Sequence, residues 1–195
     1  MRVCVVRPER QPQVGSAARP RSDSRDDAAR TPAKKYAVVD SSISKALRLF
    51  VPVDFTVPRR LETPLFVLEP LGPQHNDEDF AAWSTSIEHI RGTPGWGGSS
   101  WPRAMSPEDN LRDLEMHARH FERREGFTYT VIGRAEGEVV GCVYIYPPRD
   151  DVSDARVTSW VRETSANLDA ELWRSVSDWL AGSWPFQRFE YATRS

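Results

Sequence analysis

The sequence predicts one α/β domain, of the α+β type, in which helices flank a mixed and mostly antiparallel central sheet. Residues 127–146 carry the clearest signal, because two β-branched and aromatic segments flank a short polar turn at 134–137, as in a β-hairpin. Two segments with apolar residues at helical spacing precede the hairpin. A strand pattern, an amphipathic helix pattern and a last strand pattern follow it, an order typical of a sheet covered by helices.

The first strand is expected at Pro64–Leu71, between prolines and a glycine-proline turn. Asn76, with an acid three residues later at Asp79, predicts the N-cap of the first helix. A loop rich in glycine and proline, residues 92–102, ends that helix. The helix has one apolar stripe, formed by Phe80, Trp83, Ile87 and Ile90.

The second helix is expected to begin after Ser106 and to end near Gly126. Serine is a good N-cap, Pro107 fits the first helical position, and the two acids that follow face the positive end of the helix dipole. The predicted buried stripe consists of Leu111, Leu114, His117 or Ala118, and Phe121.

The remaining elements follow closely in the chain. The hairpin strands are predicted at Phe127–Ile132 and Val139–Tyr146, and a third strand at Ala155–Arg162. A last strand is predicted at Phe186–Ala192, and its open edge makes a homodimer through this strand an expectation. The helix between the last two strands carries the stripe Leu168, Leu172, Val176, Trp179 and Leu180 and ends at Gly182.

A basic N-terminal extension, residues 1–57, precedes the predicted domain at residues 58–195. Residues 1–60 contain 13 Lys or Arg and 6 Asp or Glu, whereas the rest contain 13 and 22. The net charge of −2 is therefore the sum of a positive N-terminal part and a negative remainder. Met1–Lys35 has few large apolar side chains, so burial of apolar surface cannot offset the conformational entropy lost on folding. We therefore expect the extension to be disordered or loosely packed, with a short helix at Ala37–Phe50.

Composition argues against several classes of protein. The positive charges of the extension are interrupted by Asp23 and its neighbours and lack interleaved aromatics, so no nucleic-acid partner is expected. Charged residues from Arg7 onward end the apolar start before a cleavable signal forms, and no run reaches about 18 apolar residues, so no membrane span is expected. Cys4 and Cys142 form no disulfide framework, and a cytoplasmic location is the default expectation.

The order of elements over residues 61–194 resembles the GNAT superfamily of N-acetyltransferases. The resemblance is carried by the opening strand Leu65–Leu71 and by the strand Glu138–Ile145. Ala155–Arg162 is similar to the strand whose exposed backbone receives the pantetheine arm of acetyl-CoA in that family. The resemblance implies acyl transfer from acetyl-CoA, as co-substrate, to an amine of a small molecule or a peptide, with a backbone N–H near Val161 or Arg162 polarising the thioester.

The phosphate-binding turn is where the chain departs from the family pattern. The family has Arg/Gln-x-x-Gly-x-Gly/Ala here, whereas the matching stretch Thr164–Asp169 has no glycine. Glu163, Asp169 and Glu171 oppose phosphate, because a carboxylate about 4 Å from a phosphate charge costs roughly 1–4 kcal/mol. Weak or altered cofactor binding is therefore expected. The residues that the resemblance assigns to the cofactor are Val161, Arg162, Ser165, Ala166, Asn167, Leu168, Asp169 and Ala170.

Catalytic candidates remain open in the sequence. The family continues past the last strand with a helix that often supplies a tyrosine acid, and this chain is expected to be short of it at the C-terminus. Tyr144, Tyr146 and Tyr191 are alternatives for that acid, and Glu88 or His89 for a general base.

Two further readings concern aromatic and histidine residues. Trp96 and Trp101 lie in the loop that forms part of the acceptor wall in the family, although such a loop also folds onto its own hydrophobic residues. His117 and His120 share a helix face, but no further ligand completes a set, so no metal is predicted. The alternative to an enzyme is a non-catalytic GNAT-like domain that binds a partner.

Overall fold

The computed structural model describes residues 49–194 and contains one six-stranded sheet. The strands follow one another across the sheet in chain order. Neighbours are antiparallel except the last two, which are parallel. The strands are β1 (Leu61–Glu62), β2 (Phe66–Pro70), β3 (Phe127–Gly133), β4 (Val139–Tyr146), β5 (Ala155–Val161) and β6 (Phe189–Tyr191).

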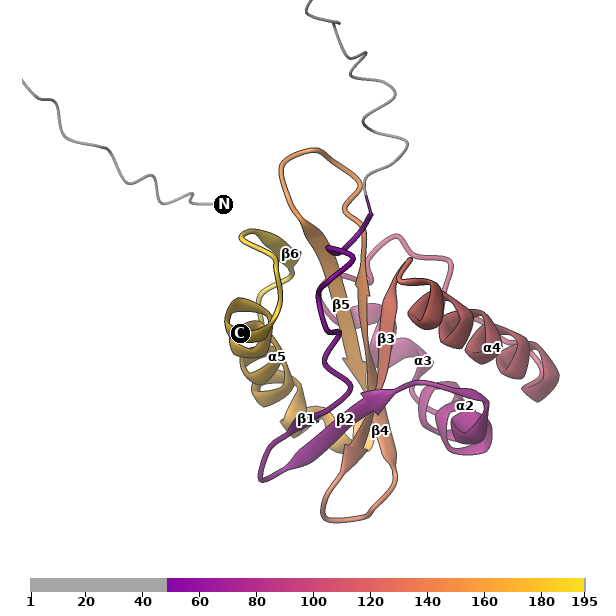
Figure 1. Cartoon of the computed structure of the whole chain (residues 1–195). Helices are drawn as coiled ribbons and strands as arrows, with labels where there is room; N and C mark the ends of the chain where they lie inside the picture. Colours follow the sequence, from indigo (N-terminus) through magenta and orange to yellow (C-terminus); the bar gives the residue numbers. More distant parts are fainter. Residues whose placement is uncertain (1–48, 195) are drawn as a thin grey trace, which may run out of the picture. The chain divides into compact units, whose positions relative to one another are not determined.

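Helices cover both faces of the sheet. Figure 1 shows α2, α3 and α4 on one face and α5 on the other. This arrangement confirms the predicted fold class, a mostly antiparallel sheet flanked by helices. The helices are η1 (Pro73–His75), α2 (Asn76–Ser84), α3 (Ile87–Gly92), α4 (Pro107–Arg123), η2 (Glu163–Leu168) and α5 (Asp169–Ser183), where η marks a 3₁₀-helix. No helix in residues 49–194 is long and apolar enough to cross a membrane.

The predicted hairpin is present as β3 and β4, with one irregularity. Ile132 lies opposite Val139, but Val131 lies opposite Gly141, so Val140 is an extra residue and forms a β-bulge. The last strand is shorter than predicted: β6 spans Phe189–Tyr191 and pairs with β5 only as far as Val157. Beyond that point the edge of β5 is not paired with β6.

The first predicted helix is divided into α2 and α3. The break falls at Ser86, which is buried and whose hydroxyl accepts a hydrogen bond from the N–H of Glu163 at 3.0 Å. The helix is thus interrupted where Ser86 contacts Glu163. The predicted N-cap is also shifted, because Asn76 is the first residue of α2 and His75 precedes it.

Ser106 caps α4 as predicted. Its hydroxyl accepts a hydrogen bond from the N–H of Asp109 at 3.1 Å, and the carboxylate of Asp109 reaches back to the N–H of Ser106. The helix ends at Arg123, and the C-cap residue Arg124 has a left-handed backbone conformation, with φ of 60°. The result is a helix of 17 residues.

Two hydrophobic clusters lie on the two faces of the sheet. Alternation along β4 divides its side chains, so that Val143 and Ile145 join the cluster of α5, whereas Cys142 joins the cluster of α2, α3 and α4. Trp179 belongs to the first cluster and Trp83 to the second, as their positions on helical stripes predict.

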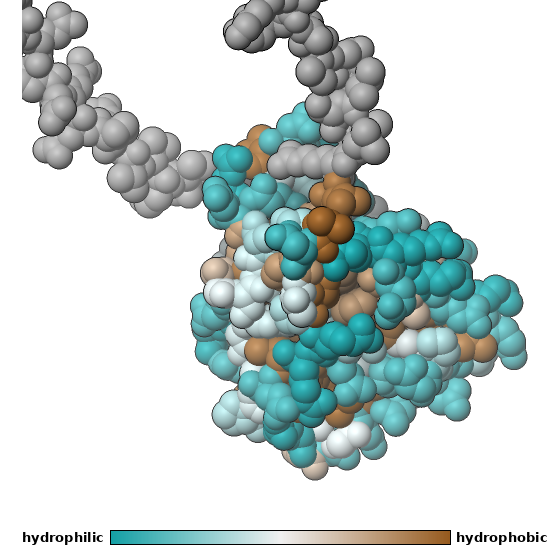
Figure 2. Space-filling model, viewed as in Figure 1, coloured by the Kyte–Doolittle hydropathy of each residue, from teal (hydrophilic) through white to brown (hydrophobic). Residues whose placement is uncertain are grey.

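The packed part of the chain begins before the predicted boundary at Pro58. Val51 is only 1% exposed, Phe50 stacks on Phe127 and Phe186, and Phe55 contacts Trp184. Figure 2 shows hydrophobic residues next to the start of the described chain, where Leu49 and Val53 are exposed. The predictions for Met1–Lys35 and most of the predicted helix Ala37–Phe50 lie outside residues 49–194.

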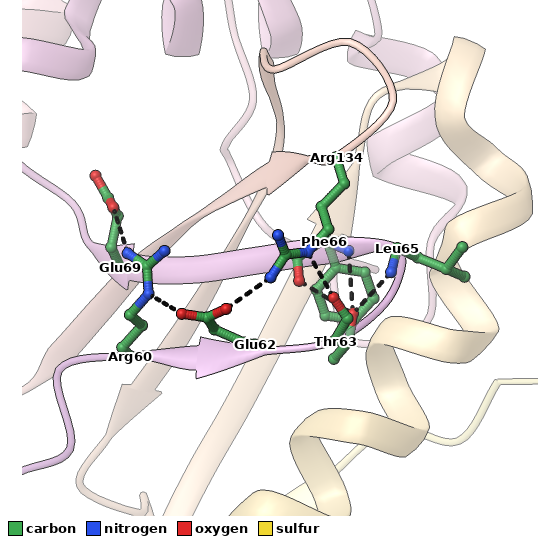
Figure 3. A network of polar contacts seen from close by, with 7 residues as sticks. All are labelled: Arg60, Glu62, Thr63, Leu65, Phe66, Glu69 and Arg134. Carbon is green, nitrogen blue, oxygen red and sulfur yellow. Dashed lines mark hydrogen bonds and ion pairs between the residues drawn. The ribbon is translucent and has the colours of Figure 1, made fainter.

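A polar network fixes the turn between β1 and β2 (Figure 3). The hydroxyl of Thr63 accepts hydrogen bonds from the N–H groups of Leu65 and Phe66. Arg134, from the turn after β3, donates to the carbonyl of Thr63 at 2.7 Å and forms an ion pair with Glu62 at 2.7 Å. Side chains therefore tie the short strand β1, which was not predicted, to the edge of the sheet.

Candidate functional site

A cavity of about 340 Å³ opens between α4, the loop after α3, and the strands β4 and β5. This volume is in the range of small-molecule sites. Acidic side chains enter it from α2 and α4, and basic ones from β5, from the loop before it and from α4. Its charged and titratable lining includes Asp79, Asp113, His117, His120, Arg149 and Arg156.

Three aromatic side chains that the sequence singled out meet in this cavity. The ring centroids of Trp96 and Trp101 are 4.9 Å apart, and Tyr144 lies 5.6 Å from Trp96. Trp101 also lies 5.9 Å from Trp83 in the core. The loop therefore folds onto its own hydrophobic residues and also forms a wall of the cavity, so the two readings of Trp96 and Trp101 are compatible.

Tyr144 remains protonated in this environment. Its hydroxyl accepts a hydrogen bond from the indole N–H of Trp160 at 3.2 Å. Burial raises the pKa of Tyr144 well above its usual value, and the nearby Cys142 and Asp79 raise it further. A phenol in this state is protonated near neutral pH and loses its proton only to a strong base.

Asp79 is a buried carboxylate behind the aromatic wall. It accepts hydrogen bonds from Asn110 Nδ2 at 3.1 Å and from the thiol of Cys142 at 3.3 Å. Asn110 is held in turn by the indole N–H of Trp83 at 3.0 Å. Burial raises the pKa of Asp79, because it disfavours the charged form.

His117 is a neutral imidazole on the helical wall. Its Nδ1 lies 2.8 Å from the hydroxyl of Tyr146 and 3.0 Å from that of Thr128, and the Nδ1 of His120 lies 3.0 Å from the same Tyr146 hydroxyl. Burial lowers the pKa of His117 to about 4, and His120 contributes a smaller lowering. His117 is therefore uncharged at neutral pH, and burial makes its imidazole a weaker base than a free one. No group of three metal-ligating side chains occurs in residues 49–194.

Glu88 and His89, the other predicted base candidates, do not line the cavity. Glu88 is exposed on α3 and forms an ion pair with Arg91 at 2.8 Å. The Nε2 of His89 is buried and has no hydrogen-bond partner in the described part of the chain. The structure thus brings Tyr144 to the cavity and leaves these two residues outside it.

The unpaired edge of β5 is occupied by side chains. The carbonyl of Ser159 accepts hydrogen bonds from the indole N–H of Trp96 at 2.8 Å and from Arg194 Nη2 at 3.1 Å. The side chain of Arg194 is 3% exposed and forms an ion pair with Asp169 at 2.7 Å. Tyr191 donates to or accepts from the hydroxyl of Ser159 at 2.6 Å, and burial raises the pKa of Tyr191 to about 12.

Of the two predicted thioester donors, only Val161 faces this edge. The N–H of Arg162 donates to the carbonyl of Val140 at 2.7 Å, so it is committed to the sheet. Backbone groups alternate in direction along a strand, and the Ser159 carbonyl points away from β4. Val161, two residues later, therefore directs its N–H to the same open side.

The predicted phosphate-binding turn is a compact 3₁₀-helix rather than an open loop. The N–H of Ser165 donates to the carbonyl of Arg162 at 2.9 Å. The Arg162 guanidinium is paired with Glu138 at 3.0 Å and donates to the Ser165 hydroxyl at 3.3 Å. Ala166, Asn167 and Leu168 complete η2, and Asp169 and Ala170 begin α5.

Comparison with known proteins finds likeness in three dimensions only. No family model and no curated protein matches the sequence. A GCN5-related N-acetyltransferase from Brucella melitensis superposes with a TM-score of 0.51 at 20% identity, over 68% of this chain and 59% of that one. A probable acetyltransferase of the GNAT family from Chromobacterium violaceum superposes with a TM-score of 0.51 at 13% identity, over 86% of this chain and 75% of that one.

The chain has the GNAT fold. This finding confirms the fold that the order of elements implied. On the GNAT fold, β5 is the strand that the family resemblance assigned to the pantetheine arm. His117, Asp79 and Arg194 were not singled out for this site from the sequence. Their only signals were two histidines on one helix face, an acid in a first turn and a basic residue near the end of β6.

Proposed function

We propose that the protein is an acyltransferase that transfers an acyl group from acetyl-CoA to an amine bound in the cavity. The observation that carries the proposal is the position of the cavity on the GNAT fold. Arg156 and Thr158 of β5 line it, and Trp96, another lining residue, contacts the carbonyl of Ser159 on the open edge of that strand. An amine in the cavity therefore lies beside the backbone that would orient a thioester.

The lining residues supply groups for the proton transfers of such a reaction. The amine must lose a proton as its nitrogen forms a bond to the carbonyl carbon, and the sulfur must gain one as the carbon–sulfur bond breaks. His117, neutral at pH 7, is our candidate for the first transfer. Tyr144, which keeps its proton, is our candidate for the second. The N–H of Val161 is our candidate for the group that stabilises charge on the carbonyl oxygen.

A non-catalytic binding domain is the second candidate, and a different observation favours it. Arg194 and Trp96 already satisfy the Ser159 carbonyl, and Arg162 is already paired with Glu138. Acetyl-CoA would have to displace the side chain of Arg194 to reach this edge. The same contact would weaken cofactor binding by this domain.

Calorimetric titration of acetyl-CoA into the full chain separates the two candidates. Arg194→Met combined with Asp169→Asn should increase the affinity, because the two changes uncover the edge of β5 without leaving the charge of Asp169 unpaired. Asp169→Asn should increase it by a few-fold to about a hundredfold, since it removes a charge that opposes phosphate and also releases Arg194. Asp178→Asn, an exposed change on the same helix, is the control and should have no effect. The enzyme proposal fails if none of these proteins binds at millimolar acetyl-CoA.

Release of free thiol from acetyl-CoA in the presence of a panel of amines tests the assigned groups. Tyr144→Phe and His117→Gln should each lower kcat by about 10²- to 10⁴-fold, the usual range for a lost acid or base. KM for acetyl-CoA should change little, because neither side chain belongs to η2 or to the edge of β5. A change in KM without a change in kcat would show that neither residue transfers a proton in the reaction.

A further inference from the structure

We infer that the acceptor amine also carries a carboxylate, so that the cavity selects a free α-amino acid with an apolar side chain. The cavity holds two arginines that make no ion pair in residues 49–194, an acid that makes none, and an aromatic wall. The claim that the amino acid is acylated rests on the proposed function. Binding of the amino acid to the cavity can be measured without any acyl transfer.

Arg156 is the first element of the carboxylate site. It lies on β5 and lines the cavity, and its Nε is buried without a hydrogen-bond partner in residues 49–194. Its register neighbour on β6 is Glu190, but no ion pair joins the two. A buried donor without a partner is unfavourable unless a ligand satisfies it.

Arg149 is the second element. It is exposed in the loop between β4 and β5, directly after two prolines that restrict the backbone, and it too lines the cavity. Burial lowers the pKa of Arg156, and repulsion from the charge of Arg149 lowers it further, whereas the charge of Glu190 raises it. A carboxylate between them would relieve this repulsion and accept the free donors.

The opposite charge of the ligand has its own partner on α4. Asp113 lines the cavity and forms no ion pair or hydrogen bond within the described residues. Burial raises the pKa of its carboxyl, and the charges of Arg103 and Arg112 offset this only in part. An ammonium group would supply a counter-ion in direct contact with this carboxylate.

The aromatic wall would select the side chain of the ligand. Trp96 and Trp101 present two indole rings tilted against each other, a surface that favours an apolar side chain and also attracts a cation. A cavity of about 340 Å³ accommodates a single amino acid rather than a long chain. A phosphate-bearing amine would use the same arginines, so it is an explicit alternative in the test.

Calorimetry on the full chain with matched ligands tests the inference. L-phenylalanine should bind at least roughly tenfold more tightly than phenethylamine, which lacks the carboxylate, and than 3-phenylpropanoate, which lacks the amine. Arg156→Met should remove the preference over phenethylamine and leave the affinity for phenethylamine unchanged. Arg149→Met, at an exposed position in the loop between β4 and β5, should reduce the preference. Arg119→Met, on the exposed face of α4, is the matched control.

Two outcomes would overturn the inference. One is equal binding of L-phenylalanine and phenethylamine by the unmodified protein. The other is binding of O-phosphoethanolamine or inorganic phosphate that is tighter than that of L-phenylalanine and depends on Arg156. Carboxylate-dependent binding without acetyl-CoA binding would leave the inference standing and remove the proposed function. Acetylation of amines with and without a carboxylate at equal rates would support the proposed function and overturn the inference.

Discussion

The hydroxyl of Ser106 satisfies one of the N–H groups that would otherwise be left without a partner at the start of α4. Ser106→Ala should therefore lower the free energy of unfolding by about 0.5–2 kcal/mol, measured by denaturant titration. Ser183→Ala, at the exposed end of α5, is the control and should change it by less than about 0.5 kcal/mol. An unchanged midpoint for Ser106→Ala would mean that the cap does not stabilise the folded state.

His117 makes stability depend on pH in a defined direction. Its pKa is lowered from 6.5 to about 4 in the folded chain, so the unfolded chain binds the proton more readily. The stabilisation from the neutral imidazole is complete above pH 6.5 and is lost progressively as the pH falls toward 4.

Urea unfolding at several pH values between about 7 and 4 measures this dependence. The unmodified protein should lose more stability over this interval than His117→Gln, because glutamine does not titrate. Parallel pH profiles for the two proteins would show that the imidazole is not desolvated as the structure indicates.

The separate residues also show what the sequence can and cannot predict about the site. Trp96, Trp101 and Tyr144 were predicted, because aromatic residues in a loop and on a strand are visible locally. Asp79 and His117 were not, because their importance comes from partners more than ten residues away in the chain. Long-range partners of this kind leave no periodic signal.

At the scale of elements, the hairpin β3–β4 and the capped helix α4 followed from local patterns. The division of α2 from α3 did not, since it depends on a hydrogen bond between Ser86 and Glu163. The sequence likewise did not reveal β1, whose two residues are too short for alternation to be seen. Local signals thus identify long periodic elements, and tertiary contacts decide where they break.

Gly141 lies where β4 approaches β5 too closely for a side chain. A Cβ at this position would lie 2.1 Å from the carbonyl oxygen of Trp160, which is backbone and cannot rotate away. Gly141→Ala should therefore lower the free energy of unfolding by at least about 2 kcal/mol, measured by thermal and urea unfolding.

Gly182→Ala is the matched substitution for this prediction. A Cβ added at Gly182 would meet no atom within 4 Å, and the residue is in α5, where alanine is favoured over glycine by roughly 0.5–1 kcal/mol. The substitution should have no destabilising effect, or a stabilising one. Equal effects of the two substitutions would argue against the tight approach of β4 and β5.

For the whole molecule, the extent of the folded unit is the main question. Removal of Met1–Lys35 should leave the melting temperature unchanged, because that segment lacks apolar periodicity. Removal of residues 1–57 should lower stability by about 3 kcal/mol or more, since it takes away Val51, Phe50 and Phe55 from the core.

The second truncation also removes partners from Arg124. Its guanidinium donates to the carbonyls of Pro52 at 2.6 Å and Phe55 at 2.8 Å. Thermal unfolding of the two truncated chains beside the full chain is the measurement. A large drop for the shorter deletion would place a structural element within the first 35 residues.

The indoles at the cavity have a consequence for observing this protein. Trp83, Trp96, Trp101 and Trp160 are linked through Trp101, at centroid distances of 4.9–6.0 Å. Chromophores at this separation exchange excitation, and their emission depends on the polarity of the space beside them. A molecule that enters the cavity should therefore change the emission wavelength and intensity of the intrinsic tryptophan fluorescence. Ligand binding can then be followed without an attached dye.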